Sequence, residues 1–396
     1  MTRPALRFYV HVPYCSARCG YCDFNTYVPG ESGRGAPGLW RGAAEAETRL
    51  ARTQLADDPR PVSSIFFGGG TPTLLPADDL GAVISMIRSE FGLTPAAEIT
   101  VEANPENISE KLLGELLSVG VNRLSIGMQS ADPVVLSHLD RRHGGDAAVR
   151  AADLAITAGF GRLSLDLIYA TPGETDDSWR GTVQAAIDSG VGHVSAYALK
   201  VEPGTALARQ VSTGVMPPVD DDAAASRYEI ADDMLSHAGL QWYEISNWAR
   251  AGQECHHNLG YWRGDDWWGV GPGAHSHVAG TRWWNRRHPQ AWIDSLRDGS
   301  GPRAGQEVLT GPQRSTEAVM LAIRLAEGFD PEALAGPATP TADLIDRGLL
   351  ERCGERRCRL TRRGRLLADA LTLELLAAAE SSCEASDDDV PRTKVG

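Results

Sequence analysis

The chain has 396 residues, and 52 acidic against 38 basic side chains give it a formal net charge of −14 at pH 7. This acidic balance argues against a protein that binds nucleic acid or anionic lipid over a broad basic face. The sequence also lacks the ~18 consecutive apolar residues of a membrane-spanning helix and the apolar run of a secretory signal, so we expect a cytoplasmic protein.

Strand and helix patterns alternate through the first half of the chain. The predicted strands are residues 7–12, 63–68, 98–103, 122–128, 162–168 and 193–199. The predicted helices lie near residues 40–55, 77–91, 108–119, 146–158 and 175–189, and Ser109 is a candidate N-cap. This alternation predicts an α/β fold with a parallel sheet, and the nearly continuous apolar content of the strands indicates that both sheet faces are covered. Site residues should then gather at the carboxyl ends of the strands.

The second half of the chain predicts further regions. Residues 214–225 have the composition of a connector, and residues 240–295 hold eight of the ten tryptophans. Residues 305–375 have the pattern of helix, turn, helix, short hairpin and final helix, which is typical of a small α+β winged-helix-like domain. Residues 376–396 are small, polar and acidic, which predicts a disordered tail.

Three of the seven cysteines, Cys15, Cys19 and Cys22, lie close together near the N-terminus. The others are scattered: Cys255, Cys353, Cys358 and Cys383. A structural zinc site needs four protein ligands, whereas three thiolates can hold a 4Fe–4S cluster that leaves one iron open to an exogenous ligand. Three incidental buried thiols are the alternative, but a loop that also contains Arg18 and Asp23 is a poor place to bury them. The spacing therefore predicts a 4Fe–4S cluster.

The segment YVHVPYCSARCGYCDF resembles the cluster loop of the radical S-adenosylmethionine (SAM) superfamily. The segments GGGTPT, IGMQS, DLIYATPGE, YEISNWA and HNLGYWRGDDWWGVGPGAHS extend the resemblance to the branch that contains the oxygen-independent coproporphyrinogen III oxidases (HemN) and the haem chaperones (HemW). The resemblance implies an incomplete (βα)6 TIM-like barrel over residues 1–235, an aromatic-rich extension over 236–304 and a HemN-type C-terminal domain over 305–375.

The resemblance also implies a set of ligand-binding residues. Cys15, Cys19 and Cys22 would bind three irons of the cluster, and the amino and carboxylate groups of SAM would chelate the fourth. The positions that match SAM contacts of the family are Tyr9, Tyr21, Gly69, Gly70, Thr71, Glu102, Gln129, Arg141 and Asp166. Among these, Asp166 suits a ribose hydroxyl and Arg141 suits a carboxylate, while the GGGT backbone would bond the methionine end.

Three features of the chain favour the haem chaperones over the oxidases. Phe24 stands where the oxidases carry a further cysteine, and Tyr9 lies almost at the start of the chain, without the long extension of the oxidases. The segment HNLGYW matches the HNxxYW motif that is associated with haem binding in the chaperones. The resemblance therefore implies His257 as a haem ligand, with Tyr261 and Trp262 packed on the macrocycle.

Other interpretations of this region stay open. His257 could be a hydrogen-bonded core residue, and the neighbouring Cys255 or His256 could ligate haem instead. Trp267 and Trp268 could simply cover the open side of a partial barrel. The segment GVGPGAHS has the glycines of a phosphate-binding loop but follows no strand-to-helix pattern, so we interpret it as a tight turn.

The resemblance implies a chaperone that binds haem, a 4Fe–4S cluster and SAM, and that transfers haem to apo-haem proteins such as respiratory cytochromes. A haem donor protein and an electron donor would be further partners, and a partner could bring the protein to the membrane surface. The alternatives are an oxygen-independent coproporphyrinogen III oxidase, which forms protoporphyrinogen IX by radical decarboxylation, and a radical enzyme for another substrate. The arginines around Cys353 and Cys358 would suit a winged-helix nucleic-acid reader, but the acidic chain and the single short basic patch argue against it. We therefore expect this segment to be a docking surface for a protein partner or a cover over the site.

Overall fold

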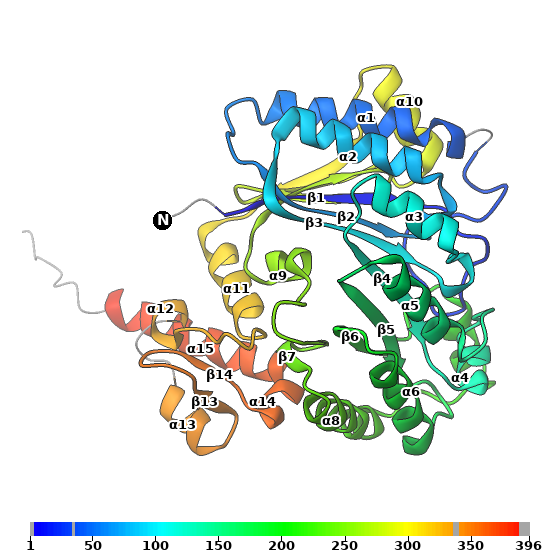
Figure 1. The fold of residues 1–396 in the computed structure, drawn as a ribbon. Helices are drawn as coiled ribbons and strands as arrows, with labels where there is room; N and C mark the ends of the chain where they lie inside the picture. Colours follow the sequence, from blue (N-terminus) through cyan, green and yellow to red (C-terminus); the bar gives the residue numbers. More distant parts are fainter. Residues whose placement is uncertain (1–3, 34–35, 336–339, 388–396) are drawn as a thin grey trace, which may run out of the picture. The chain divides into compact units, whose positions relative to one another are not determined.

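The structure, a computed structural model, describes residues 4–33, 36–335 and 340–387 (Figure 1). Its contacts divide the chain into two units. The first unit comprises Met1–Gln241, Ser246–Gly260 and Asp265–Val308, and the second comprises Trp242–Ile245, Tyr261–Gly264 and Leu309–Gly396. The predicted segments 1–235 and 236–304 thus fall mainly in one unit.

Six parallel strands alternate with helices in the first unit, as the sequence predicts. The strands are β1 (Leu6–Val12), β2 (Val62–Gly69), β3 (Leu93–Ala103), β4 (Arg123–Gln129), β5 (Leu163–Tyr169) and β6 (His193–Ala198). The helices between them include α1 (Ala36–Gln54), α2 (Ala77–Phe91), α3 (Glu110–Ser118), α5 (Ala147–Ala158) and α6 (Asp176–Asp188). Ser109 caps α3 by accepting a hydrogen bond from the Leu112 N–H, which confirms the predicted helix start.

The prediction that residues 214–225 form a connector is wrong for the C-terminal part of that segment, which is helical. The long helix α8 (Asp221–His237) begins inside this segment. Two shorter helices of the same unit, α4 (Pro133–His138) and α7 (Ala206–Ser212), precede it in the chain. The Asp220 carboxylate accepts hydrogen bonds from the N–H groups of Asp222 and Ala223. This cap starts a helix because it satisfies backbone donors that have no partner within the first helical turn.

The parallel strands alternate between apolar and polar residues, which corrects the description of the strands as nearly continuously apolar. Helices cover the outer face of the curved sheet (Figure 1). On β2, Ile65 and Phe67 are fully buried on one face, and Ser64 lies on the opposite, concave face, where its Oγ is 2.8 Å from His257 Nδ1. The register extends this alternation across the sheet, because Ser64 lies beside Arg7 of β1 and Glu98 of β3. The interior of the curved sheet is therefore lined with polar groups.

The aromatic-rich region extends the same sheet at both edges. Its strands are β8 (Asn247–Ala249), β9 (Asp266–Val270), β10 (His275–Val278), β11 (Thr281–Asn285) and β12 (Arg303–Val308). The order within the unit is β12-β11-β10-β9-β1-β2-β3-β4-β5-β6-β8, and α10 (Pro289–Arg297) packs on α1. Trp268 pairs with Phe8 on the helix-covered face and is 2% exposed, so it forms part of the core and does not cover the open side of the barrel.

The second unit contains the predicted helices and hairpin. Its elements are α11 (Gly311–Ala322), α12 (Pro331–Ala335), α13 (Thr341–Asp346), β13 (Leu350–Arg352), β14 (Cys358–Leu360), α14 (Arg362–Leu366) and α15 (Ala368–Asp387). Its core includes Val319, Leu344, Leu360 and Leu375, which are buried together. Two elements, β7 (Gln241–Glu244) and α9 (His256–Trp262), contribute residues to both units.

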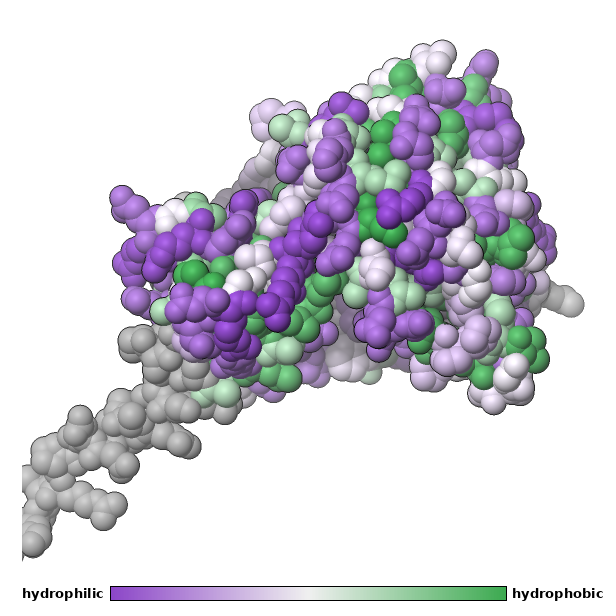
Figure 2. Space-filling model, turned by 90° about the horizontal axis from the view of Figure 1, so that it is seen from below, coloured by the Kyte–Doolittle hydropathy of each residue, from purple (hydrophilic) through white to green (hydrophobic). Residues whose placement is uncertain are grey.

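The predicted disordered tail over residues 376–396 is wrong for its first part. α15 continues to Asp387, because the segment LELLAAAES consists mostly of strong helix formers. The remaining part of the tail lies outside the described residues. Among the residues that the structure describes, no helix is long and apolar enough to cross a bilayer. The face drawn in Figure 2 is mostly hydrophilic, with apolar residues in small groups.

Candidate functional site

The three neighbouring cysteines lie on the loop that follows β1. Cys15, Cys19 and Cys22 are free and half-buried. The base of the loop is closed by backbone hydrogen bonds, because the Cys15 N–H donates to the Tyr27 carbonyl over 3.0 Å and the Tyr27 N–H donates to the Pro13 carbonyl over 2.7 Å. The loop therefore presents all three thiols from one closed turn at the carboxyl end of the sheet.

The three thiols are close enough to influence one another's ionisation. Burial raises the pKa of Cys15, and it raises the pKa of Cys22 to about 11, with the charges of the neighbouring cysteines acting in the same direction. Within the described parts of the chain, no three His, Cys, Asp or Glu side chains are arranged to hold a single metal ion. A cluster does not require such an arrangement, because each thiolate binds a different iron. The donor set thus fits the predicted cluster.

The glycine-rich segment after β2 packs directly on the cluster loop. The Gly70 N–H donates to the Val12 carbonyl over 2.8 Å, and the Thr71 N–H donates to the Tyr14 carbonyl over 2.7 Å. These two N–H groups therefore hold the loop, whereas the resemblance implied that they would bond a ligand. A Cβ at Gly70 would lie 2.6 Å from the Tyr14 carbonyl oxygen, so only glycine permits the approach. The Thr71 hydroxyl lies 3.9 Å from Cys15 Sγ.

Arg141 reaches the cluster loop from the segment that follows α4. Its Nη1 donates to Cys19 Sγ over 3.5 Å, and its Nη2 donates to Asn104 Oδ1 over 2.8 Å and to the Gly127 carbonyl over 3.1 Å. A Cβ at Gly127 would lie 2.8 Å from Gln129 Nε2 and 3.3 Å from Nη2, so the glycine in IGMQS leaves room for both side chains. The guanidinium is therefore held beside a thiol by fixed partners.

Two carboxyl groups lie on the concave face near the strand ends. Asp166 accepts hydrogen bonds from Ser125 Oγ at 2.6 Å and from Ser195 Oγ at 2.7 Å, and Glu102 accepts one from the Gly69 N–H at 3.0 Å. Burial raises the pKa of both carboxyls, and for Glu102, with the charge of Asp166 adding to the effect, it reaches about 7. A carboxyl that is protonated near neutral pH can both donate to and accept from ligand hydroxyls.

Of the remaining predicted SAM positions, Gln129 and Tyr21 lie at the same edge, whereas Tyr9 is in the middle of β1. Gln129 ends β4 with a left-handed φ of 63° and is 8% exposed. Tyr21 packs on an apolar cluster formed by α4, β5 and α7, and burial raises the pKa of its hydroxyl. The Tyr9 hydroxyl lies 3.0 Å from His11 Nδ1, and its ring stacks on Phe66 with 6.3 Å between centroids.

His257 lies in the interior of the curved sheet, near the amino ends of the strands. It is 1% exposed, its ring stacks on Phe66 with 5.1 Å between centroids, and its Nδ1 lies 2.8 Å from Ser64 Oγ. The backbone N–H of His257 donates to Glu98 Oε1 over 2.9 Å. Burial lowers the pKa of His257 to about 3, and the charge of Arg7 acts in the same direction. The imidazole is thus a neutral, hydrogen-bonded core group in this state.

The alternative haem ligands Cys255 and His256 lie in the first unit, and the motif residues Tyr261 and Trp262 lie in the second. Cys255 is buried, its Sγ lies 3.5 Å from Glu98 Oε1, and burial raises its pKa to about 12. His256 is half-buried beside it. Tyr261 and Trp262 lie in the second unit and are half-buried. The buried Trp262 Nε1 has no hydrogen-bond partner among the described residues.

Two asparagines that the sequence analysis did not select connect parts of the site. Asn104, the first residue after β3, hydrogen-bonds both Arg141 and Thr71. Asn25 donates to the Pro272 carbonyl over 3.0 Å, so the GVGPGAHS turn supports the cluster loop. Their positions in the sequence could have identified them. Asn104 directly follows the strand β3, and Asn25 lies shortly after the last cysteine of the cluster motif.

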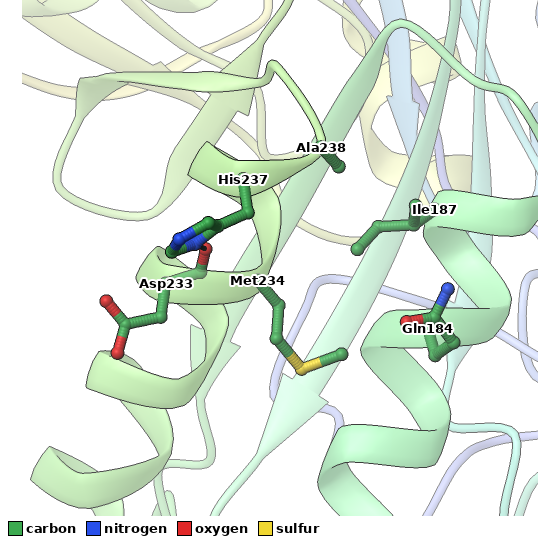
Figure 3. A pocket seen from close by; sticks show the side chains of 6 residues that line it. All are labelled: Gln184, Ile187, Asp233, Met234, His237 and Ala238. Carbon is green, nitrogen blue, oxygen red and sulfur yellow. Dashed lines mark hydrogen bonds between the residues drawn. The ribbon is translucent and has the colours of Figure 1, made fainter.

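A shallow groove between α6 and α8 lies apart from these residues (Figure 3). It encloses about 360 Å³, and Figure 3 shows its six lining residues: Gln184, Ile187, Asp233, Met234, His237 and Ala238. None of the predicted cluster, SAM or haem residues lines it. The groove therefore does not mark the candidate site.

Two arginines of the hairpin in the second unit form ion pairs. Arg356 pairs with Asp330 at 3.2 Å, and Arg359 pairs with Glu351 at 2.7 Å.

Comparisons with known proteins identify similar sequences and a similar fold. Residues 9–186 match the model of the Radical SAM superfamily. The chain is 48% identical over 369 residues to the haem chaperone HemW of Mycobacterium tuberculosis, a match that covers 93% of this chain and 94% of the relative. It is 36% identical over 307 residues to the haem chaperone HemW of Escherichia coli, covering 74% and 79%. The solved structure of coproporphyrinogen III oxidase (HemN) from Escherichia coli superposes with a TM-score of 0.80 at 22% identity, covering 94% of this chain and 90% of that chain.

Proposed function

This chain belongs to the HemW family of the radical SAM superfamily, and on that premise we propose that it is a haem chaperone. It binds haem, a 4Fe–4S cluster and SAM, and it passes haem to apo-haem proteins such as respiratory cytochromes. A haem donor protein and an electron donor for the cluster would be its other partners. The observation that carries the proposal is the closed loop with three neighbouring thiols, to which Thr71 and Arg141 are directed.

Cys15, Cys19 and Cys22 would each bind one iron of the cluster. The chemistry that a reduced cluster supplies when bound is transfer of one electron to the sulfonium of SAM. Glu102 and Asp166 would bind the ribose hydroxyls, because both carboxyls lie buried on the concave face near the same strand ends. The remaining assigned positions would bind or enclose SAM: Tyr9, Tyr21, Gly69, Gly70, Thr71, Gln129 and Arg141.

Cluster loading is tested by anaerobic reconstitution with iron and sulfide. Cys22→Ala should lose the cluster absorbance, whereas Cys353→Ala, which changes an exposed thiol of the second unit, should retain it. Equal loading of the two variants would contradict the assignment of the metal ligands.

Haem ligation by His257, with Tyr261 and Trp262 against the macrocycle, requires α9 to open. The reason is that His257 is 1% exposed and bonded to the inner face of the sheet. Haem titration of the reconstituted protein should saturate near one haem per chain, and His257→Ala should lose or alter the spectrum. His256→Ala tests the alternative ligand, because loss of the spectrum in that variant alone would assign the haem to the half-buried His256.

Haem transfer is the second half of the test. Haem should move from the loaded protein to an apo-cytochrome faster than it is released to a haem scavenger in buffer. If transfer never outpaces release, the chaperone function fails. Formation of protoporphyrinogen IX from coproporphyrinogen III, with SAM and a reductant, would instead establish the oxidase.

A further inference from the structure

We propose that Asn104 is a positioning residue that orients Arg141 and Thr71 toward two of the cluster thiolates and thereby raises the reduction potential of the cluster. This inference rests on the proposed function, because it requires the cluster to be bound. Asn104 is neither a thiolate ligand nor one of the positions matched to SAM, and it lies at the carboxyl end of β3.

The side-chain amide of Asn104 uses its two ends for two different partners. Oδ1 accepts from Arg141 Nη2 at 2.8 Å, and Nδ2 donates to Thr71 Oγ1 at 3.0 Å. The orientation of the amide follows from chemistry, because a guanidinium can only donate and must therefore face the oxygen. The nitrogen is then directed to the hydroxyl of Thr71.

The orientation of the Asn104 amide determines where the proton of the Thr71 hydroxyl points. Because Thr71 Oγ1 accepts from Asn104, its single proton is left to point elsewhere, and Cys15 Sγ lies 3.9 Å away in the donating direction. On the other side, Arg141 Nη1 donates to Cys19 Sγ over 3.5 Å. One amide therefore aligns a cation with one sulfur and a hydroxyl dipole with a second sulfur.

The surroundings leave Arg141 little freedom to compensate for loss of the amide. Its Nη2 also donates to the Gly127 carbonyl over 3.1 Å, and its Nε donates to His143 Nε2 over 3.4 Å. A shifted guanidinium would have to give up these bonds. Removing Asn104 therefore removes one of the bonds that keep the cation beside Cys19.

The expected consequence is electronic. A reduced cluster carries one more negative charge than an oxidised cluster, and a nearby cation and hydrogen-bond donors to its sulfurs stabilise that charge. Asn104→Ala should lower the ratio of reduced to oxidised cluster at a fixed potential at least tenfold, which corresponds to a shift of about 59 mV toward negative potentials for one electron. Asn104→Asp should shift the potential in the same direction, because it keeps the acceptor for Arg141 but loses the donation to Thr71 and adds a negative charge.

The experiment is a redox titration of reconstituted protein without SAM, followed by electron paramagnetic resonance of the reduced cluster. The matched control is Asn107→Ala, since Asn107 lies in the same turn and its Oδ1 has no hydrogen-bond partner among the described residues. Thr71→Val, a nearly isosteric change, should give a smaller negative shift and tests the inference even if Asn104→Ala fails to fold. A wild-type potential in the loaded Asn104 variants or in Thr71→Val would overturn the inference alone. Failure of the wild type to bind four irons per chain would overturn the proposed function together with it.

Discussion

Substitution of Gly69 by alanine tests whether the segment after β2 is packed as tightly as its geometry indicates. Gly69 has a φ of 110°, and a Cβ there would lie 2.3 Å from Cε1 of the His11 ring. Gly159, at the end of α5, has a similar φ of 105°, but its Cβ would meet nothing within 4 Å among the described residues. Gly159→Ala is therefore a control that has the backbone strain without the clash.

The expected losses of stability differ by a calculable amount. A left-handed backbone costs an alanine about 1–2 kcal/mol, and this cost is common to both variants. Only Gly69→Ala also displaces the buried His11 ring, which hydrogen-bonds the Tyr9 hydroxyl at 3.0 Å and the Asn25 carbonyl at 2.9 Å. Leaving the partners of these two bonds unsatisfied costs about 1–3 kcal/mol each. Gly69→Ala should thus lose about 2–6 kcal/mol more than Gly159→Ala.

Urea unfolding of the two cluster-free variants, followed by circular dichroism, measures that difference directly. Without iron and SAM, a change in ligand binding cannot contribute to the result. Equal losses in the two variants would refute the reasoning, because they would mean that His11 moves aside at no cost.

Two further predictions concern buried charges. Burial raises the pKa of Glu47 from 4.5 to about 7, so its protonated form stabilises the folded protein fully below pH 4.5, and this contribution is lost as the pH rises to 7. Over that window, the free energy of unfolding should fall by about 3 kcal/mol more in the wild type than in Glu47→Gln, and parallel urea-unfolding profiles would contradict the prediction. Asp265→Asn breaks a buried pair with Arg7 at 2.6 Å and should cost about 3–5 kcal/mol. Glu327→Gln, which breaks an exposed pair with Arg263, should cost less than about 1 kcal/mol, and equal shifts in melting temperature would refute the distinction.

The architecture of the first unit was predictable because local patterns agree with the tertiary structure. Each strand and helix of the parallel half carries its own signal, such as the Ser109 cap before α3. The polar concave face was not predicted because Tyr9 and Phe66 stand at concave positions and make their strands look continuously apolar. The extension of the sheet by β9 was also hidden, since its pairing with β1 joins segments about 260 residues apart.

The candidate site was predictable only in part. The cysteine loop and the polar strand ends are visible as motifs, but the partners of each side chain are not. Arg141 reaches Cys19 because the chain turns at Asp140, which has a left-handed φ of 53°. An asparagine or aspartate is among the few residues other than glycine that adopt this conformation readily, but the sequence does not say that this aspartate does so. The bridge through Asn104 depends on that turn and was therefore missed.

The position of α9 bears on how haem could bind. Glu98 accepts hydrogen bonds from the N–H groups of both His256 and His257, at 3.1 Å and 2.9 Å, and the imidazole of His257 is bonded to Ser64. Opening α9 far enough to expose the imidazole would break at least the two hydrogen bonds from these backbone N–H groups to the Glu98 carboxylate, at about 1.5–3 kcal/mol each. The open form is then disfavoured ~10²–10⁴-fold, and the apparent haem affinity falls by the same factor unless contacts made by haem in the open state compensate. If His257 is the haem ligand, its binding would therefore be gated by α9, whereas binding through the half-buried His256 would not require exposure of the buried imidazole of His257.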